Sequence, residues 1–380
     1  MKNILIIIVG FLIYQNGFTQ IKRNPTKQTN LTIEINKNIE LLGLVYFILF
    51  EGQDLETKTL KVEGKTLLKK EWHNYGFTIY QQYKSSVSSE NLGKSLSVAS
   101  HLRIEYISAF LLQTESVPQA KFSDSINKKY YLDFSKEKNI GEAKKNAEIF
   151  LNGLNAFSKE IDFDNYLTNS KKYYNKVIEE VQNGLPNTRF IKVMESFYKK
   201  KFDNYILIPS LTIPKGMGFA FWNTNSAEKK IFSVFGALDI QEFENSKNLK
   251  MGFLNQQKLR ELTVHEFGHS FVNPTIDKLP ANLLIRTEHL FIPIKSAMIE
   301  QDYINWKLCI DEHFVRAGEI IIADKVEGKS GANELLLEYQ KNRQFKYLPE
   351  ILIELRKYDK VKNQSYYETV KKIMKQLAEL

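Results

Sequence analysis

The sequence predicts an α+β fold that is mostly helical, with a small central sheet packed beside a helix that contains residues 265–269. Helical periodicity covers residues 37–185, short strand-like segments follow, and helical periodicity returns after residue 253. This order of helices, strands and helices differs from the regular alternation of an α/β fold. The chain has 380 residues, of which 43% are hydrophobic, so it can bury a substantial core.

The N-terminus has the features of a secretory signal peptide. Lys2 precedes an apolar run over residues 4–14, and Gly17 and Thr19 fit the two small-residue positions before a cleavage site. We therefore expect residues 1–19 to be a signal peptide and the protein to be exported, either to the periplasm or into the medium.

A membrane anchor is not expected after this cleavage. The apolar run is shorter than the roughly 20 residues that a transmembrane helix needs, and no cysteine near the cleavage site could carry a lipid. Residues 20–36 are polar and contain Pro25, so they predict a linker. Cys309 is the single cysteine, which excludes an intramolecular disulfide.

Two further regions follow the linker. Apolar residues spaced three and four apart predict a helical N-terminal region over residues 37–185. Residues 186–380 form the second region, which either stands beside the first or joins it in one compact unit. The predicted helices of the first region cover residues 38–50, 96–113, 143–161 and 173–185.

The second region begins with three short segments that are rich in β-branched and aromatic residues. Proline, glycine and asparagine separate them, which predicts strands over residues 205–211, 218–222 and 230–238. Residues 216–223 contain glycines that would let the backbone of an extended substrate approach an edge strand closely. An ordinary core strand is the equally weighted alternative for this segment. Helices are then predicted over residues 255–272, 282–300, 302–325, 332–342, 346–357 and 365–379.

The helix over residues 255–272 carries the sequence HEFGH. His265 and His269 lie one turn apart on one face, so both imidazoles can reach one zinc ion. Glu266 lies about 100° around the helix, where its carboxylate can take a proton from an activated water. Gly268 leaves room for another element to approach. Asn273 and Pro274 are expected to end this helix.

A zinc site of this kind needs a third protein ligand. A third histidine nearby would require glycine at position 272 and histidine at 275, but the chain has Val272 and Thr275. A glutamate from a later helix is the alternative, and Glu312 is the favoured candidate. Glu319 and Glu288 are the other two candidates.

Several residues near Glu312 are candidates for supporting roles. Arg316 and Glu319 lie on the same side of the helix as Glu312, so these two residues could orient the metal ligands. His289, Tyr303 and His313 could donate to a developing oxyanion, or they are ordinary structural residues. The formal charge of +9 comes without a stripe of lysine and arginine, so we expect a solvated surface and no nucleic-acid partner.

The block HEFGHSFVNP, the short sheet before it and Glu312 after it together resemble the gluzincin metallopeptidases. The block also resembles an uncharacterised bacterial family, one of those named as domains of unknown function. The gluzincin resemblance implies zinc on His265 and His269, a glutamate ligand, Glu266 as general base, and a peptide or protein substrate. It also implies a zincin-like catalytic region over residues 186–380.

This chain differs from the thermolysin-like pattern at Arg316, where that pattern has aspartate. The alternative interpretation is a zinc-binding, peptidase-like domain with a binding or structural role and little turnover. Glu266 argues for catalysis, since a purely structural zinc site needs no base.

Overall fold

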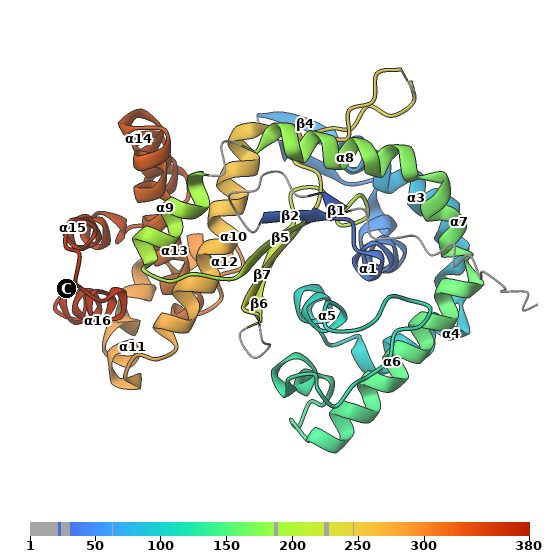
Figure 1. Ribbon diagram of the computed structural model, residues 1–380, viewed down its shortest axis with the longest axis horizontal. Coiled ribbons are helices and arrows are strands. Elements are labelled where there is room, and N and C mark those ends of the chain that lie inside the picture. Colours follow the sequence, from blue (N-terminus) through green and yellow to red (C-terminus); the bar gives the residue numbers. More distant parts are fainter. Residues whose placement is uncertain (1–21, 24–30, 63, 186–188, 224–227, 246) are drawn as a thin grey trace, which may run out of the picture.

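The computed structural model describes residues 22–23, 31–62, 64–185, 189–223, 228–245 and 247–380. The predicted signal peptide and most of the predicted linker lie outside these residues. The described part confirms the α+β class: helices, a small sheet, and helices again (Figure 1). No helix within it is long and apolar enough to cross a membrane.

The N-terminal helices surround one end of the sheet (Figure 1). The predicted helix over residues 96–113 is in fact two helices, because its halves pack on different partners: α4 packs along α6, and α5 packs against α1. The helices are α1 (Lys37–Leu49), α2 (Lys69–Trp72), α3 (Asn74–Tyr83), α4 (Glu90–Ala99), α5 (Ile104–Leu111), α6 (Ile140–Glu160), α7 (Phe163–Asn169) and α8 (Lys171–Gly184). Helix α9 (Arg189–Tyr198) lies at the other end, among the C-terminal helices (Figure 1).

The main sheet has the strand order β1-β2-β5-β7-β6, in which β1 is Lys22–Arg23 and β2 is Leu31–Glu34. Strand β5 (Asn204–Pro209) pairs in parallel with β2 and with β7 (Lys230–Phe235), and β6 (Gly218–Asn223) is an antiparallel edge strand on β7. All three predicted strands are therefore confirmed. A separate hairpin consists of β3 (Thr59–Val62) and β4 (Lys65–Leu68).

Part of the predicted linker is instead a strand of the sheet. Strand β2 (Leu31–Glu34) pairs with β5, and the two-residue β1 (Lys22–Arg23) pairs with β2. Leu31 and Ile33 are both fully buried, and they lie two residues apart on one face of the strand. A strand needs only every second residue to be apolar, so a mostly polar segment can still form one.

The C-terminal helices cover the other end of the sheet (Figure 1). The predicted helix over residues 282–300 is divided by a 3-10 segment over Glu288–Ile294 that contains Pro293. The helices are α10 (Gln256–Ile276), α11 (Ala281–Thr287), α12 (Lys295–Ile299), α13 (Trp306–Val326), α14 (Lys329–Leu337), α15 (Leu348–Asp359) and α16 (Tyr366–Leu377).

Helix α10 does not end at Pro274, contrary to the prediction. It continues to Ile276 with the proline inside it. Proline has no N–H, so the carbonyl of Ser270 loses its helical donor. The Nζ of Lys200 donates to that carbonyl at 3.3 Å, which replaces the missing hydrogen bond.

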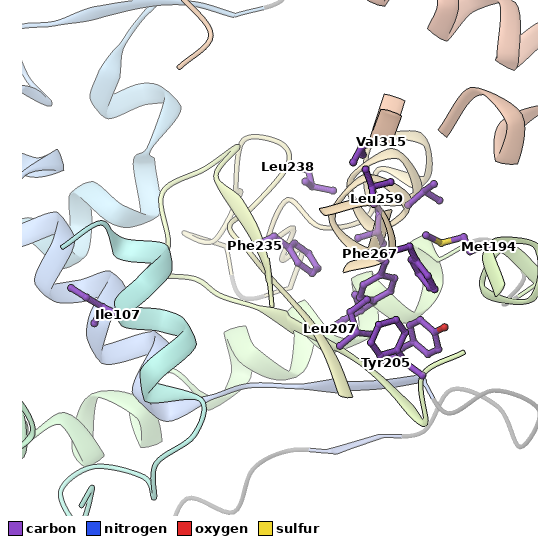
Figure 2. Close-up of a cluster of buried hydrophobic side chains, with 14 of the residues drawn as sticks. Ile107, Met194, Tyr205, Leu207, Phe235, Leu238, Leu259, Phe267 and Val315 are labelled. Carbon is purple, nitrogen blue, oxygen red and sulfur yellow. The ribbon is translucent and has the colours of Figure 1, made fainter. Parts of the chain in front are cut away.

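The core centres on α10, which packs between the sheet, α9 and α13. Phe267 of α10 lies close to Tyr205 of β5, with Met194 of α9 and Val315 of α13 nearby (Figure 2). Each fully buried side chain of this size contributes about 1.5–3 kcal/mol. One continuous cluster of buried residues includes residues from both predicted regions.

A buried carboxyl group lies in the N-terminal half of this core. Glu40 of α1 is fully buried, and its Oε2 accepts from Tyr174 Oη at 2.9 Å and from Thr212 Oγ1 at 3.1 Å. Its Oε1 has no partner among the described residues. Burial raises the pKa of Glu40 from 4.5 to about 7, although the hydrogen bonds oppose this shift.

We predict that Glu40 makes the folded state less stable as the pH rises. The unfolded chain loses this proton near pH 4.5 and the folded chain keeps it until about pH 7, so stability falls across that window. The total effect is up to ~3 kcal/mol. Glu40→Gln should remove this loss. Urea unfolding at pH 5, 6, 7 and 8 should therefore show the free energy of unfolding of the variant rising relative to that of the wild type as the pH increases. The exposed Glu148→Gln should not change the slope, and equal slopes for all three chains would contradict the prediction.

Candidate metal centre

Helices α10 and α13 bring three metal-binding side chains together. His265, His269 and Glu312 each offer one ligand atom, and these atoms lie within 4.8 Å of one another. The two Nε2 atoms are 3.1 Å apart. The Nε2 of His269 lies 3.2 Å from Glu312 Oε1, and that of His265 lies 3.6 Å from Glu312 Oε2.

These spacings fit a tetrahedral zinc ion. Zinc binds nitrogen and oxygen at about 2.0–2.1 Å, so two donors at the tetrahedral angle stand about 3.3 Å apart. The two Nε2 atoms stand 3.1 Å apart, close to that value, and each lies 3.2 or 3.6 Å from a different oxygen of the Glu312 carboxylate. Three protein donors would leave one position open, which is the arrangement of a catalytic rather than a structural zinc site.

Each histidine has an oxygen behind it. His265 Nδ1 lies 3.3 Å from Glu319 Oε2, and His269 Nδ1 lies 3.2 Å from Asn273 Oδ1. The contact of His269 with Asn273 is a hydrogen bond, and such a partner orients an imidazole so that its Nε2 faces a metal. The contact of His265 with Glu319 is a close charge contact without a hydrogen bond. Glu319 therefore lies behind His265, outside the three-donor cluster. The sequence analysis named Asn273 as a helix end and did not identify it as a partner of His269. Its position four residues after His269, on the same face of the helix, could have indicated that role.

Arg316 connects the acidic groups of the centre. Its Nη2 lies 3.1 Å from Glu312 Oε2, and its Nη1 lies 3.7 Å from Glu319 Oε2. The guanidinium also lies over the rings of Tyr339 and Phe345, at 4.6 and 4.7 Å from their centroids. The side chain is buried, so these contacts hold it in one orientation beside Glu312.

The electrostatics of the centre favour a bound cation. Burial alone would raise the pKa of Glu312, but His265, His269 and Arg316 hold it well below its usual range. Burial opposes a charge on His269, yet Glu312 raises the pKa of this histidine to about 9. The carboxylate therefore attracts positive charge to His269 Nε2, and a metal ion would take the place of that proton.

Glu266 lies in the wall of a cavity of about 1250 Å³, together with His265. Its carboxyl group is buried, and burial raises its pKa. Gly218 of β6 lies so close that a Cβ there would be 3.6 Å from Glu266 Oε1. The glycine end of edge strand β6 thus borders the cavity beside the candidate base.

Tyr303 also lines this cavity. Its hydroxyl oxygen accepts from Arg316 Nη2 at 3.2 Å and from Arg343 Nη2 at 3.3 Å. Burial raises the pKa of Tyr303, so the hydroxyl keeps its proton at neutral pH. The sequence analysis did not identify Arg343, which comes from a distant segment and carries no local motif.

Other predicted residues lie elsewhere. Glu288 and His289 are exposed in the 3-10 segment after α11, and neither lines the cavity. His313 is buried on the far side of α13, where its Nδ1 lies 2.8 Å from the Cys309 carbonyl oxygen. The rings around it are Trp306, Phe345 and Tyr347. Burial raises the pKa of Cys309 to about 12, which suits an inert packing residue.

Comparisons with known proteins identify a family and give no function. The family model described as "Domain of unknown function (DUF4932)" matches residues 69–378, so the chain belongs to that family. No curated protein and no solved structure matches the chain. The matched range includes the three donors of the candidate metal centre and all the cavity-lining residues except Lys61 and Val62.

We predict that the purified chain binds about one zinc ion and that His269→Ala abolishes this binding, since two donors cannot hold the ion tightly. Metal content would be measured by mass spectrometry after purification without chelators. The exposed His101→Ala is the matched control and should bind zinc normally. Equal zinc content in the His269 and His101 variants would contradict the site.

Residues behind the histidines should tune this affinity. Glu319→Gln and Asn273→Ala are each expected to weaken zinc binding about 10- to 100-fold, because the imidazoles lose their orientation. Competition with a fluorescent chelator would measure the dissociation constants. An unchanged affinity in both variants would show that these oxygens do not support the ligands.

Proposed function

We propose that this member of the DUF4932 family is an exported zinc-dependent metallopeptidase of the gluzincin type. One observation carries the proposal: the buried carboxyl group of Glu266 lies in the wall of a large cavity, directly beside the three-donor cluster. The HEFGH sequence and its resemblance to gluzincins support the same conclusion. A structural zinc site would need neither the carboxylate nor the cavity.

His265, His269 and Glu312 would hold the zinc ion, and Glu319, Asn273 and Arg316 would orient these three ligands. When bound, zinc supplies Lewis acidity, which polarises the scissile carbonyl and makes a water molecule more acidic. Glu266 accepts a proton from that water, and the water oxygen bonds to the carbonyl carbon. Glu266 then gives the proton to the leaving amine as the C–N bond breaks. Its raised pKa suits both steps, since it brings the carboxyl closer to neutral pH.

Tyr303 is the candidate for stabilising the developing oxyanion. Two arginine donors occupy the lone pairs of its hydroxyl oxygen, so its O–H hydrogen is free to donate into the cavity. A neutral donor held in a fixed position stabilises negative charge that develops in the transition state.

Strand β6 is the candidate for binding the substrate backbone. Among the described residues it pairs only with β7. At one end of its other edge the carbonyl oxygen of Trp222 already accepts from Tyr130 Oη at 2.8 Å and from Lys129 Nζ at 3.3 Å, whereas the Gly218 end borders the cavity. An extended peptide could add to this edge, with Gly216 and Gly218 leaving room at the cavity. Peptides rather than small amides are therefore the proposed substrates.

The proposed location outside the cytoplasm depends on the N-terminal sequence alone. The run over residues 4–14 and the small residues after it support export to the periplasm or the medium. The single cysteine is compatible with this location, because the fold is held by its core without disulfides.

We predict that Glu266→Gln keeps its zinc but loses hydrolysis of an unstructured protein by at least ~10²-fold, because a general base contributes about 10²–10⁴-fold. Cleavage of fluorescein-labelled casein and metal content would be measured together. Zinc binding without cleavage of any peptide by the wild type would instead support a binding or structural role. Equal cleavage by variant and wild type would remove Glu266 from the mechanism.

Tyr303→Phe tests the oxyanion donor. We expect kcat to fall about 10²-fold or more while KM changes little, since the hydroxyl acts mainly in the transition state. Steady-state kinetics on a fluorogenic peptide would give both parameters. An unchanged kcat would show that Tyr303 serves only to hold Arg316 and Arg343.

A further inference from the structure

Three arginines line the cavity, and they differ in their partners. They are Arg260, Arg316 and Arg343. Arg260 pairs with Glu327, and Arg316 pairs with Glu312. Within the part of the chain that the structure describes, the guanidinium of Arg343 forms no ion pair with a carboxylate and donates only to neutral groups. Because arginine keeps its charge at ordinary pH, Arg343 brings an uncompensated cation to the cavity.

Neutral groups hold the side chain of Arg343 in place. Its Nε donates to Gln301 Oε1 at 2.8 Å, and its Nη2 donates to Tyr303 Oη at 3.3 Å. The amide of Gln301 donates in turn to the carbonyl oxygen of Arg343 at 3.0 Å. The guanidinium also lies 5.7 Å from the ring centroid of Phe345. The group is therefore oriented before a ligand binds, which lowers the entropic cost of binding one.

Arg343 keeps donors available for a ligand. The side chain is half-buried in the cavity wall, and its Nη1 has no hydrogen-bond partner among the described residues. Nη2 carries two hydrogens and gives one of them to Tyr303. The two Nη atoms of a guanidinium match the two oxygens of a carboxylate. A carboxylate could therefore bind to Arg343 without displacing Gln301 or Tyr303.

A second guanidinium lies close to that of Arg343. The Nη2 atoms of Arg316 and Arg343 both donate to Tyr303 Oη, at 3.2 and 3.3 Å. Like charges at such a short separation repel each other. Two glutamates already offset the charge of Arg316. Arg343 is thus the cation of this pair that an added anion would neutralise.

The same part of the cavity contains a buried donor without an acceptor. Arg316 is only 4% exposed, and its Nε has no hydrogen-bond partner among the residues that the structure describes. Its side chain contributes to the cavity wall. An unpaired buried donor is costly, so a ligand that is rich in acceptors is favoured beside these two arginines.

The glutamates near Arg343 do not neutralise it. Glu334 and Glu338 also line the cavity, but both are exposed to solvent. Glu334 Oε1 accepts from Ser330 Oγ at 3.2 Å, and Glu338 accepts from the amide of Asn342. Charges on exposed side chains are screened by solvent and salt, so they oppose an anion on the half-buried Arg343 only weakly.

The two lysines that line the cavity are weaker candidates for binding an anion. Lys258 Nζ lies 3.0 Å from Asp239 Oδ1, and Lys61 is exposed on the β3–β4 hairpin. A lysine ammonium is a strongly hydrated point charge on a flexible stem, whereas the guanidinium of Arg343 is planar and already oriented. Arg343 is therefore the cation of the cavity that best fits a carboxylate.

Three consecutive contacts connect Arg343 to the candidate metal centre. Arg343 Nη2 lies 3.3 Å from Tyr303 Oη, which lies 3.2 Å from Arg316 Nη2, and that atom lies 3.1 Å from Glu312 Oε2. One residue of an extended chain spans at most about 3.3–3.6 Å. A carboxylate on Arg343 would therefore belong to a residue within a few positions of the bond at the candidate centre.

We propose that Arg343 is a subsite for a carboxylate group of the substrate, with Gln301 and Tyr303 holding its guanidinium in place. A peptide offers this group at its C-terminus or on an aspartate or glutamate side chain. The first source would direct cleavage to the end of a chain, and the second would direct it to sites near acidic residues. The cleavage part of this inference rests on the proposed peptidase function, whereas the binding part does not.

Binding is measured with the Glu266→Gln chain in a buffer that contains zinc, by fluorescence anisotropy of labelled, alanine-rich pentapeptides. The first pair ends in a free carboxylate or a carboxamide. The second set is amidated and carries glutamate or glutamine at each internal position in turn. In one of these comparisons we expect the carboxylate form to bind about tenfold more tightly or better, as for hydrogen bonds between charged groups. Equal binding throughout, or no binding of any peptide, would overturn the subsite.

Three variants locate this preference. Arg343→Gln should bring the carboxylate and neutral forms within about twofold of each other. Arg343→Met removes the same donors but keeps an unbranched apolar side chain against Phe345, so it gives the same measurement if the first variant does not fold. Arg286→Gln removes one charge from an exposed position outside the cavity and should keep the full preference. A preference that persists in both Arg343 variants would overturn the subsite.

Cleavage by the chain with Glu266 intact separates this inference from the peptidase proposal. A carboxylate preference in binding without any cleavage keeps Arg343 as the subsite and overturns the peptidase function. Cleavage with equal kcat/KM for the carboxylate and neutral forms, together with equal binding, overturns the subsite and leaves the peptidase function standing. When both parts hold, the comparison that shows the preference identifies the C-terminus or the acidic side chain as the bound group.

Discussion

The close packing of α10 against α13 is the constraint on which the candidate site depends. Gly268 faces Val315, and a Cβ at position 268 would lie 3.2 Å from Val315 Cγ1. A Cβ on Gly318 would overlap the hydroxyl of Tyr198, whose ring stacks on Phe271 and cannot easily move away. Gly268 thus lets α10 approach α13 closely, and Gly318 lets α13 approach α9, so that Glu312 comes within reach of both histidines.

This packing also buries charges that must compensate one another. Glu312, Glu319, Glu266 and Arg316 are all buried, and isolated charges in such an environment are costly. Arg316 offsets part of the negative charge through its contacts with two of the glutamates. The carboxylates outnumber it, so the buried side chains leave room for a further positive charge. A cation at the histidine Nε2 atoms would complete the balance.

The cavity joins parts of the chain that are far apart in sequence. The β3–β4 hairpin, edge strand β6, α10 and α14 all contribute to its walls. Figure 1 shows α10 between the sheet and the C-terminal helices, so the candidate chemistry lies where the two halves of the molecule meet. The larger of two clusters of buried hydrophobic residues spans both halves and so packs these segments against one another.

Local patterns in the sequence predicted most of the longer helices, the three central strands and the placement of His265, Glu266 and His269 on one helix, but not α3, α7 or α9. They succeeded because helix and strand periodicity depends on neighbouring residues. Strand β2 was missed, because its apolar residues are few and its pairing partner lies more than 170 positions away. The end of α10 was also misjudged, because the hydrogen bond from Lys200 that replaces the one lost at Pro274 comes from another element.

The sequence by itself determined that two histidines and a glutamate share one turn of a helix, since helix geometry alone places them. Only the tertiary structure decided which distant glutamate faces them. The sequence does not distinguish Glu312, Glu319 and Glu288. In the structure Glu312 lies near both Nε2 atoms, Glu319 lies behind His265, and Glu288 is exposed. That choice follows from the packing of α13 on α10, which no local pattern contains.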